Sequence, residues 1–251
     1  MADVENIQKI SDYFSQLAGQ KPHIRDMLSF FERKNIHWIV VGGAIRYCLK
    51  NTRTRDIDIV LQGCSDSDFS AYLCEKKIPF ERNSFDGFKF IIDRKQFDVW
   101  TINNHYLFKK NIYEASVNNI QDTTFISYDS LVYDGLTKNL FIDNYMKCQR
   151  EKMLDFVGSK LAIKNNPASE VSICKIYKLI INEKYGISSD VKKFIGSYIH
   201  SCKTPSNCIN KLVVAYKRHY KKDMSRTFKE KLSRKINHQY LEFLQPCLKF
   251  E

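Results

Sequence analysis

The chain has 251 residues, with 40 Lys and Arg against 28 Asp and Glu, and a formal net charge of +12. Its hydrophobic residues (43%) and aromatic residues (13%) are enough to bury a core, which excludes a globally disordered chain. The basic charge favours a polyanionic partner. No apolar run approaches the roughly 20 residues of a membrane-spanning helix, and the first 20 residues lack a secretory apolar region. We therefore expect a cytoplasmic protein without a membrane partner.

The first part of the chain mixes helix and strand patterns. Apolar residues three to four apart predict helices over 7–17, 23–34, 44–50 and 66–76. Short apolar or alternating runs predict strands over 36–41, 56–61, 88–92 and 96–101, and a hairpin of 130–133 with 139–142. Residues 93–95 are expected as the turn between two of these strands.

Beyond residue 145 the patterns are those of helices alone. They cover 145–157, 171–185, 190–202, 206–220 and 227–244, with Pro167, Gly186 and Pro205 between them. The sequence therefore predicts an α+β protein in two domains. Residues 1–145 would form a catalytic head with a mixed sheet, and residues 146–251 an all-helical, basic C-terminal domain.

Two glycines, Gly42 and Gly43, stand between a predicted strand and a predicted helix, and Arg46 follows within the first helical turn. Glycines let the backbone approach a phosphate closely, and the start of a helix offers unpaired N–H groups. Arg46 would reach the same phosphate. Taken alone, this pattern is more typical of an ordinary strand-to-helix turn.

Asp56 and Asp58 lie two residues apart in a predicted strand, so their side chains share one face while Ile57 and Ile59 face the core. Asp is depleted from strands, and two carboxylates on one face repel each other. A hard divalent cation such as Mg²⁺ would relieve that repulsion. The alternative is a half-exposed strand with two solvated acids.

Asp98 is a further acid inside an apolar strand. If this strand neighbours the strand of Asp56 and Asp58, three carboxylates converge into the ligand set of a two-metal phosphoryl-transfer site. Considered singly, Asp98 is equally well explained as an outward-facing polar residue.

The three motifs together resemble the DNA polymerase β nucleotidyltransferase superfamily. Within it, the match is to the head domain of class II CCA-adding tRNA nucleotidyltransferases and bacterial poly(A) polymerases, which show Gly-Gly-Ala-Val-Arg-Asp followed by Asp-Ile-Asp-Ile. The matching residues here are Gly42-Gly43-Ala44-Ile45-Arg46, Asp56-Ile57-Asp58-Ile59 and Phe97-Asp98-Val99.

The resemblance covers roughly residues 36–145 and implies a polymerase β-like head. It implies Mg²⁺ or Mn²⁺ bound by Asp56, Asp58 and Asp98, and an NTP as substrate. The residues expected at the nucleotide phosphates are Gly42, Gly43, Arg46 and Arg55.

The chain also departs from the family pattern. Tyr47 stands where the family has Asp, and Thr123-Thr124-Phe125 replaces an Arg-Arg-Asp segment that helps to bind the nucleotide there. The rest of this segment resembles the family at Leu131, Tyr133 and Asp134. We therefore expect an intact metal site with altered nucleotide selection, as in a specialised enzyme.

Between residues 203 and 235 the chain is rich in Lys and Arg, with Asp223 and Glu230 as its acids and several aromatic residues between the cations. Lysines neutralise phosphates and aromatic rings stack on unpaired bases, so we expect RNA binding here. The alternative is a solvated basic surface. The residues expected to contact RNA are Lys217, Arg218, Lys221 and Lys222.

The sequence thus predicts a metal-dependent transfer of a nucleoside monophosphate from an NTP to an acceptor hydroxyl, with a tRNA-like RNA 3′ end as the expected acceptor. One alternative keeps the chemistry but uses a protein or small-molecule acceptor, as in an effector, toxin or modification enzyme. Another is a catalytically inactive RNA-binding relative.

Overall fold

The computed structural model describes residues 2–50 and 56–244. The chain divides into two compact units: unit 1 runs up to residue 146 and includes 157–165, and unit 2 comprises 147–156 and the chain from 166 on. We expected a single boundary between residues 145 and 146. The return of residues 157–165 to unit 1 was not predicted. The assignment of the two parts as a catalytic head and an RNA-binding tail stays a prediction. No helix in the described ranges is long and apolar enough to cross a membrane.

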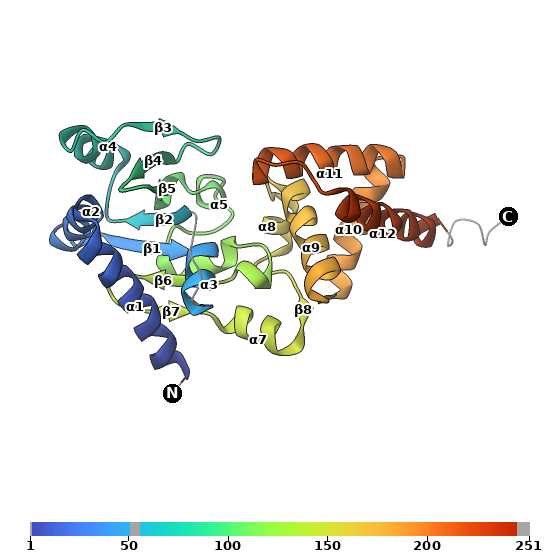
Figure 1. The fold of residues 1–251 in the computed structure, drawn as a ribbon, viewed down its shortest axis with the longest axis horizontal. Helices are drawn as coiled ribbons and strands as arrows, with labels where there is room; N and C mark the ends of the chain where they lie inside the picture. The colour runs from blue at the N-terminus through green and yellow to red at the C-terminus, as the bar shows by residue number, and fades with distance from the viewer. Residues whose placement is uncertain (1, 51–55, 245–251) are drawn as a thin grey trace. The chain divides into compact units, whose positions relative to one another are not determined.

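Unit 1 is built on one seven-stranded sheet with the order β3-β4-β5-β2-β1-β6-β7 (Figure 1). β2 and β5 are parallel, and all other neighbouring strands of this sheet are antiparallel, so the sheet is mixed as expected. The strands are β1 (His37–Val41), β2 (Asp56–Gln62), β3 (Phe80–Arg82), β4 (Phe88–Ile92), β5 (Lys95–Thr101), β6 (Val132–Asp134) and β7 (Leu140–Phe141).

One face of this sheet carries the main hydrophobic core. In α2, the residues Ile24, Met27, Leu28 and Phe31 recur at helical spacing and are all buried against it. Apolar side chains of three further helices join the same core. The four helices are α1 (Ala2–Gln20), α2 (Pro22–Arg33), α3 (Gly43–Leu49) and α4 (Asp66–Glu75).

The opposite face carries a smaller apolar cluster, in which Ile39, Val60 and Val132 of neighbouring strands pack with Phe108 and Ile120. The short elements between β5 and β6, three of which contribute to this cluster, are η1 (Ile102–Asn104), α5 (Tyr106–Lys109), α6 (Val117–Ile120), η2 (Gln121–Thr123) and η3 (Ser127–Asp129). Another short helix, α8 (Lys160–Lys164), lies in the part of unit 1 that comprises 157–165. The cluster includes no residue of β3 or β4. Polar side chains occupy part of this face of the sheet.

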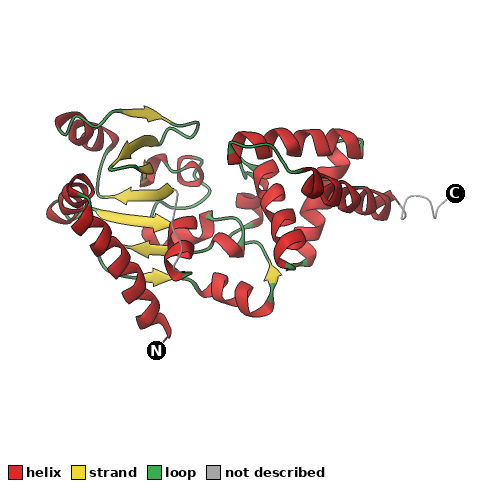
Figure 2. Ribbon diagram, viewed as in Figure 1, coloured by secondary structure: helices red, strands yellow, loops and turns green. Residues whose placement is uncertain are grey.

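Unit 2 is mainly helical (Figure 2). Its core is formed by residues that recur at helical spacing, such as Ile173, Tyr177, Ile195, Leu212 and Ile236. Its helices are α9 (Ser169–Glu183), α10 (Ser189–Ser201), α11 (Pro205–Tyr220) and α12 (Arg226–Leu244), while α7 (Asp143–Glu151) crosses the boundary between the units.

The expected helix over 145–157 is wrong in its second half. α7 ends at Glu151 because Lys152 adopts a left-handed backbone with φ of 51°. The next residues form β8 (Met153–Leu154), which pairs in parallel with β9 (Gly186–Ile187). This pairing joins segments far apart in the sequence, so local periodicity could not reveal it. The C-terminal part is therefore not entirely helical.

The turn between β4 and β5 is tighter than expected and also supports a helix. Asp93 and Arg94 both have positive φ, 48° and 65°, as a two-residue hairpin turn requires, and Lys95 already belongs to β5. The Asp93 carboxylate accepts hydrogen bonds from the backbone N–H groups of His23 (3.1 Å) and Ile24 (3.4 Å). It thus caps the first turn of α2, whose own N-cap residue makes no side-chain cap.

Candidate active site

Asp56 and Asp58 lie on the sheet face opposite the main core. Their neighbours Ile57 and Ile59 are fully buried in that core, whereas both aspartates are partly exposed. The alternation of acid and isoleucine therefore does what the strand pattern predicted. It directs apolar side chains inward and two carboxylates to the other face.

Asp98 lies beside Asp58 on the neighbouring strand. In the parallel pair of β2 and β5, Asp58 and Asp98 are direct Cα partners, and adjacent strands are about 4.8 Å apart. Phe97 and Val99 are buried in the main core, so the Asp98 side chain shares the face of Asp58. The expected adjacency of these two strands is confirmed, and all three aspartates occupy one region of one face.

The pairing also places a lysine in this region. A single cross-strand row runs from Glu81 through Lys89, Asp98 and Asp58 to Val41, each residue being the direct partner of the next. Residues in such a row on one face have Cβ atoms about 4.5–5.5 Å apart. Lys89 therefore lies next to the carboxylates.

Lys89 is not among the site residues that the sequence predicted. The alternation of Phe88, Phe90 and Ile92 toward the core signals that Lys89 faces outward. Only the register places it opposite Asp98. Its ammonium group makes an ion pair with Glu81, with Nζ and Oε1 separated by 3.2 Å.

Both oxygens of Asp98 accept hydrogen bonds from side-chain amides. Asn83 Nδ2 donates to Oδ1 at 3.1 Å, and Gln96 Nε2 donates to Oδ2 at 3.0 Å. Asn83 itself lies in the turn between β3 and β4, where its Oδ1 accepts from the backbone N–H groups of Phe85 and Gly87. Asn83 thus links the Asp98 carboxylate to the backbone of the turn between β3 and β4.

The donor set fits a hard divalent cation in its chemistry and its strand positions, because carboxylate oxygens are the ligands Mg²⁺ prefers. The side chains themselves do not form a closed ligand cluster. Within residues 2–50 and 56–244, no group of three or more His, Cys, Asp or Glu side chains is arranged to hold a metal ion. Each Asp98 oxygen accepts an amide hydrogen bond, and a carboxylate oxygen has a second lone pair with which it could bind a cation.

The glycine turn between β1 and α3 is hydrogen-bonded to the segment that leads into β6. Gly42 has φ of 61°, a conformation that favours glycine, and its N–H donates to the Leu131 carbonyl at 2.8 Å. Gly43 is the first residue of α3. The turn follows Val41, which is the partner of Asp58, so Gly42 and Gly43 lie at the same end of the sheet as the acids. Their expected contact with a phosphate stays a prediction.

Arg46 is buried, with only 9% of the residue exposed. Its Nη1 donates to the Asp129 carboxylate at 2.8 Å and to the Tyr128 carbonyl at 3.1 Å, and its guanidinium lies 4.6 Å from the centre of the Tyr128 ring. Burial acts to lower the pKa of Arg46, but the Asp129 carboxylate together with Tyr128 and Tyr145 outweighs it, and the pKa is raised. Arg46 thus ties α3 to η3, and its expected role at the triphosphate stays a prediction. Arg55 lies outside the described residues.

The segment that replaces the family's Arg-Arg-Asp offers no charged side chain. Thr123 is buried, and its hydroxyl donates to the Ile120 carbonyl at 2.7 Å. The Thr124 hydroxyl donates to the Gln121 carbonyl at 2.8 Å. Both hydroxyls are therefore used within the local turn. The expected change in nucleotide selection stays a prediction.

The four cations expected to contact RNA lie at the end of α11 and just beyond it. Lys217 pairs with Asp223 at 3.0 Å, so part of its charge is neutralised. Arg218 and Lys221 are exposed, and Lys222 lines a cavity of about 460 Å³ together with Tyr216 and Phe228. Their contact with RNA stays a prediction.

No protein-family model and no curated protein matches this sequence. Among solved structures, the chain is similar to the Thermotoga maritima CCA-adding enzyme complexed with tRNA, with a TM-score of 0.60 and 15% identity over 92% of this chain and 55% of that one. It is also similar to a tRNA nucleotidyltransferase complexed with a primer tRNA and an incoming ATP analog, with a TM-score of 0.59, 14% identity and coverages of 83% and 60%. A tRNA-processing enzyme with CTP gives a TM-score of 0.60, 12% identity and coverages of 83% and 55%.

The chain thus spans just over half the length of these proteins. The similarity extends beyond the sheet, because it covers 83–92% of this chain. The expected fold is confirmed. The chain has the α+β fold seen in the CCA-adding tRNA nucleotidyltransferases, with a mixed sheet in unit 1 and a mainly helical C-terminal part.

Proposed function

We propose that this protein is a divalent-cation-dependent nucleotidyltransferase that transfers a nucleoside monophosphate from an NTP to the 3′ hydroxyl of an RNA. The observation that carries the proposal is the pairing of Asp58 with Asp98 in neighbouring strands, with Asp56 on the same face. This arrangement occurs in a fold shared with tRNA nucleotidyltransferases. A carboxylate cluster in another fold would support a weaker conclusion, because clustered acids alone are not diagnostic.

The transfer forms a bond between the acceptor 3′ oxygen and the α-phosphorus of the NTP and breaks the bond to the leaving pyrophosphate. Asp98 is our candidate to accept the hydroxyl proton. Asp56, Asp58 and Asp98 would hold the cations, which supply charge stabilisation to the phosphates and lower the pKa of the attacking hydroxyl.

Other residues have supporting roles in this proposal. Gly42 and Gly43 leave room for the triphosphate at the end of β1, and Arg46 positions their turn through Tyr128 and Asp129. Lys89 supplies a cation beside the carboxylates, where the phosphates would bring several negative charges.

The RNA acceptor is supported by the net charge of +12 and by the neighbours solved with tRNA. A strongly basic chain attracts polyanions, and an enzyme acting on small neutral acceptors has no need of this charge. Thr123 and Thr124, whose hydroxyls bond within their own turn in place of the family's Arg-Arg-Asp, support a choice of NTP that differs from that of the CCA-adding enzymes.

The proposal is tested by incubating the protein with Mg²⁺, each α-labelled NTP in turn, and total cellular RNA. We expect RNA to become labelled with at least one NTP. Asp58→Asn should lower the labelling roughly 100-fold or more, because the cations contribute several kcal/mol to the transition state. Asp26→Asn, an equal charge change on an exposed residue of α2, should leave labelling unchanged.

The outcomes separate the alternatives. Label on a protein or small molecule, and not on RNA, would move the acceptor to that class. RNA binding without transfer by the wild type would indicate a catalytically inactive relative. If Asp58→Asn keeps near wild-type activity while its melting curve is unchanged, the carboxylate assignment is wrong.

A further inference from the structure

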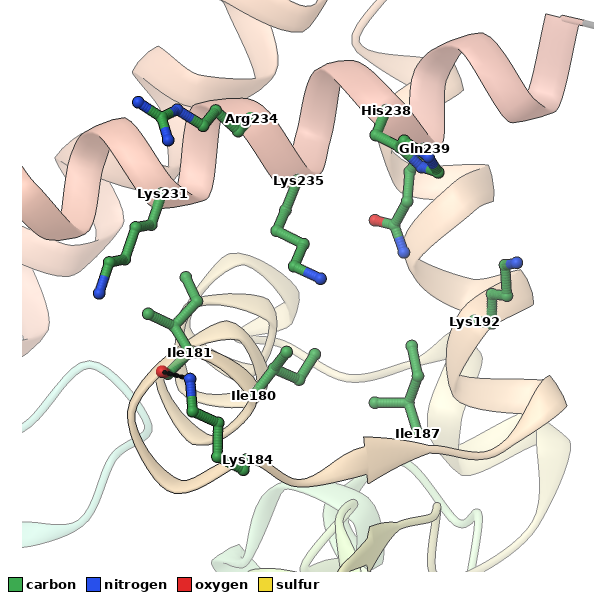
Figure 3. Close-up of a pocket in the computed structure, with 10 residues that line it drawn as sticks. All are labelled: Ile180, Ile181, Lys184, Ile187, Lys192, Lys231, Arg234, Lys235, His238 and Gln239. Carbon is green, nitrogen blue, oxygen red and sulfur yellow. Dashed lines mark hydrogen bonds between the residues drawn. The ribbon is translucent and has the colours of Figure 1, made fainter.

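Unit 2 contains a groove whose polar lining is almost entirely basic (Figure 3). Its volume is about 720 Å³, within the range of ligand pockets. It lies between the end of α9, the start of α10 and one side of α12. Lysine and arginine side chains from all three regions line it, namely Lys184, Lys192, Lys231, Arg234 and Lys235, and His238 and Gln239 are its other polar residues.

Three of these cations stand together on α12. Lys231, Arg234 and Lys235 make no ion pair and no hydrogen bond with any residue that the structure describes. Their spacings of three and four residues place like charges side by side on the helix. Like charges at these spacings destabilise a helix, so this positive face of α12 does not contribute to the stability of the helix.

Other cations of the same region are neutralised in place. Lys217 pairs with Asp223, and Arg226 pairs with Glu230 four residues along α12. Exposed cations without an ion pair to any described residue also occur on α11, such as Lys211 and Arg218. The groove differs from that surface because its cations line one cavity.

The floor of the groove is apolar. Ile180 and Ile181 of α9 and Ile187 of β9 form it, and in Figure 3 Ile180 and Ile181 lie between the α12 cations and Lys184. No Phe, Tyr or Trp side chain of the described residues lines this cavity, so it offers little surface for stacking a base. A ligand with several phosphates and apolar sugar faces fits such a lining.

We propose that this groove binds the phosphodiester backbone of a nucleic acid strand, independently of base sequence, and that this strand is the acceptor RNA. The naming of RNA rests on the proposed function, whereas the binding of a phosphodiester chain rests on the groove itself. The proposal moves the main RNA contact from the end of α11, where the sequence suggested it, to the groove side of α12.

The test uses the full-length protein in an Asp58→Asn background without NTP, so that binding is measured apart from transfer. The groove variant is Lys231→Gln/Arg234→Gln/Lys235→Gln. The matched control, Lys211→Gln/Arg218→Gln/Lys221→Gln, removes the same charge from exposed positions on and just after α11. Fluorescence anisotropy of a labelled 12-nucleotide RNA gives Kd at several salt concentrations, and circular dichroism melts establish that both variants fold.

We expect the groove variant to bind at least tenfold more weakly at low salt. The slope of log Kd against log salt should fall by about 2, because each of three phosphate interactions on a single strand contributes roughly 0.7 to that slope. The α11 control should change both quantities much less. A DNA strand and RNAs of different sequence should behave alike, because no base is read in the groove.

Several results would overturn the proposal. Equal losses in both variants would show a response to net charge only, and a larger loss in the control would return the RNA-binding surface to α11. Complete displacement of the RNA by inorganic tripolyphosphate, with no gain in affinity between 4 and 12 nucleotides, would indicate a site for small anions. If the groove variant binds RNA more weakly as expected but the wild type labels no RNA with any NTP, the proposed function is wrong while the proposal of phosphodiester binding in the groove is supported.

Discussion

At the residue scale, the role proposed for Lys89 depends on the register in which β4 pairs with β3 and β5. It is the direct partner of Asp98 on one side and of Glu81 on the other, and its ammonium group is paired with Glu81. The Glu81 side chain is 70% exposed, and ion pairs with such a partner contribute at most about 1 kcal/mol. The ammonium group can therefore leave Glu81 for a phosphate at little cost.

Under the proposed function, Lys89→Gln should weaken NTP binding about tenfold or more, the usual scale for removing one charge-assisted hydrogen bond. Glu81→Gln is the matched control, because it removes the ion pair but keeps the cation. It should bind CTP and ATP as tightly as the wild type or more tightly. Isothermal titration with each nucleotide measures this. Equal losses in both variants would show that Lys89 serves only to join β3 and β4.

His105 gives the protein an acid-sensitive point within unit 1. Its ring packs against Phe108 at 5.2 Å between centroids, and its Nδ1 is buried without a hydrogen-bond partner in the described part of the chain. Burial lowers the pKa of His105 from its ordinary value of 6.5 to about 4. Between these two pH values the unfolded chain takes up a proton that the folded chain does not, so stability is lost as the pH falls.

The expected loss between pH 6.5 and pH 4 is roughly 3 kcal/mol from this one residue. Urea unfolding at pH 7, 5.5 and 4.5 measures it, with His105→Phe as the variant that cannot titrate. The free energy of unfolding of His105→Phe should depend less on pH across this window. Parallel curves for the two proteins would contradict the assignment.

At the scale of elements, the sheet is packed tightly where β6 ends. A Cβ atom added to Gly135 would overlap the indole ring of Trp38, which is 2% exposed. The Gly135 N–H also donates to the Trp38 carbonyl at 3.0 Å, so the backbone cannot easily withdraw. Glycine is required here by close approach of β1 and not by backbone conformation.

Gly135→Ala should therefore lower the free energy of unfolding by about 1–3 kcal/mol, as overpacking of a core does. Gly19→Ala in α1 is the control, since a Cβ there meets nothing within 4 Å. In that helical position alanine should stabilise by about 0.5–1 kcal/mol. Denaturant melts of both variants compare them directly, and a Gly135→Ala protein as stable as the wild type would disprove the packing argument.

The elements themselves were predicted unevenly. β2, β4 and β5 were predicted within a residue of their ends because each alternates or runs apolar over at least five residues. β3 was missed because three residues, Phe80 to Arg82, carry no periodicity. The end of α7 was misplaced because β8 is stabilised by β9, more than 30 residues away, and not by its own sequence.

For the whole molecule, the sequence predicted the change from mixed helices and strands to helices alone near residue 145. It did not predict that the chain returns to unit 1 after this point. Residues 157–165 return to unit 1, where the Val157 N–H donates to the Phe125 carbonyl at 3.0 Å and the Ser159 N–H to the Tyr113 hydroxyl at 2.5 Å. These bonds join distant segments. A boundary drawn from composition alone cannot detect them.

From the sequence alone we could predict the fold class, pick out the three aspartates as candidate site residues and place the glycine turn between a strand and a helix. Each of these predictions depends on short-range periodicity or on a compact motif. Asp56 and Asp58 had to share a face once their strand formed. Tertiary structure alone decided what stands beside them. Parallel pairing of β2 with β5 set Asp98 against Asp58, and antiparallel pairing with β4 added Lys89.

The same holds for charge in unit 2. The sequence showed an excess of cations after residue 203 but offered no means of separating neutralised from unneutralised ones. Folding pairs Lys217 with Asp223 and gathers Lys231, Arg234 and Lys235 with cations of α9 and α10 around one groove. Register and helix packing join residues far apart in the chain, and electrostatic fields depend on distances in space, so neither can be read from local pattern.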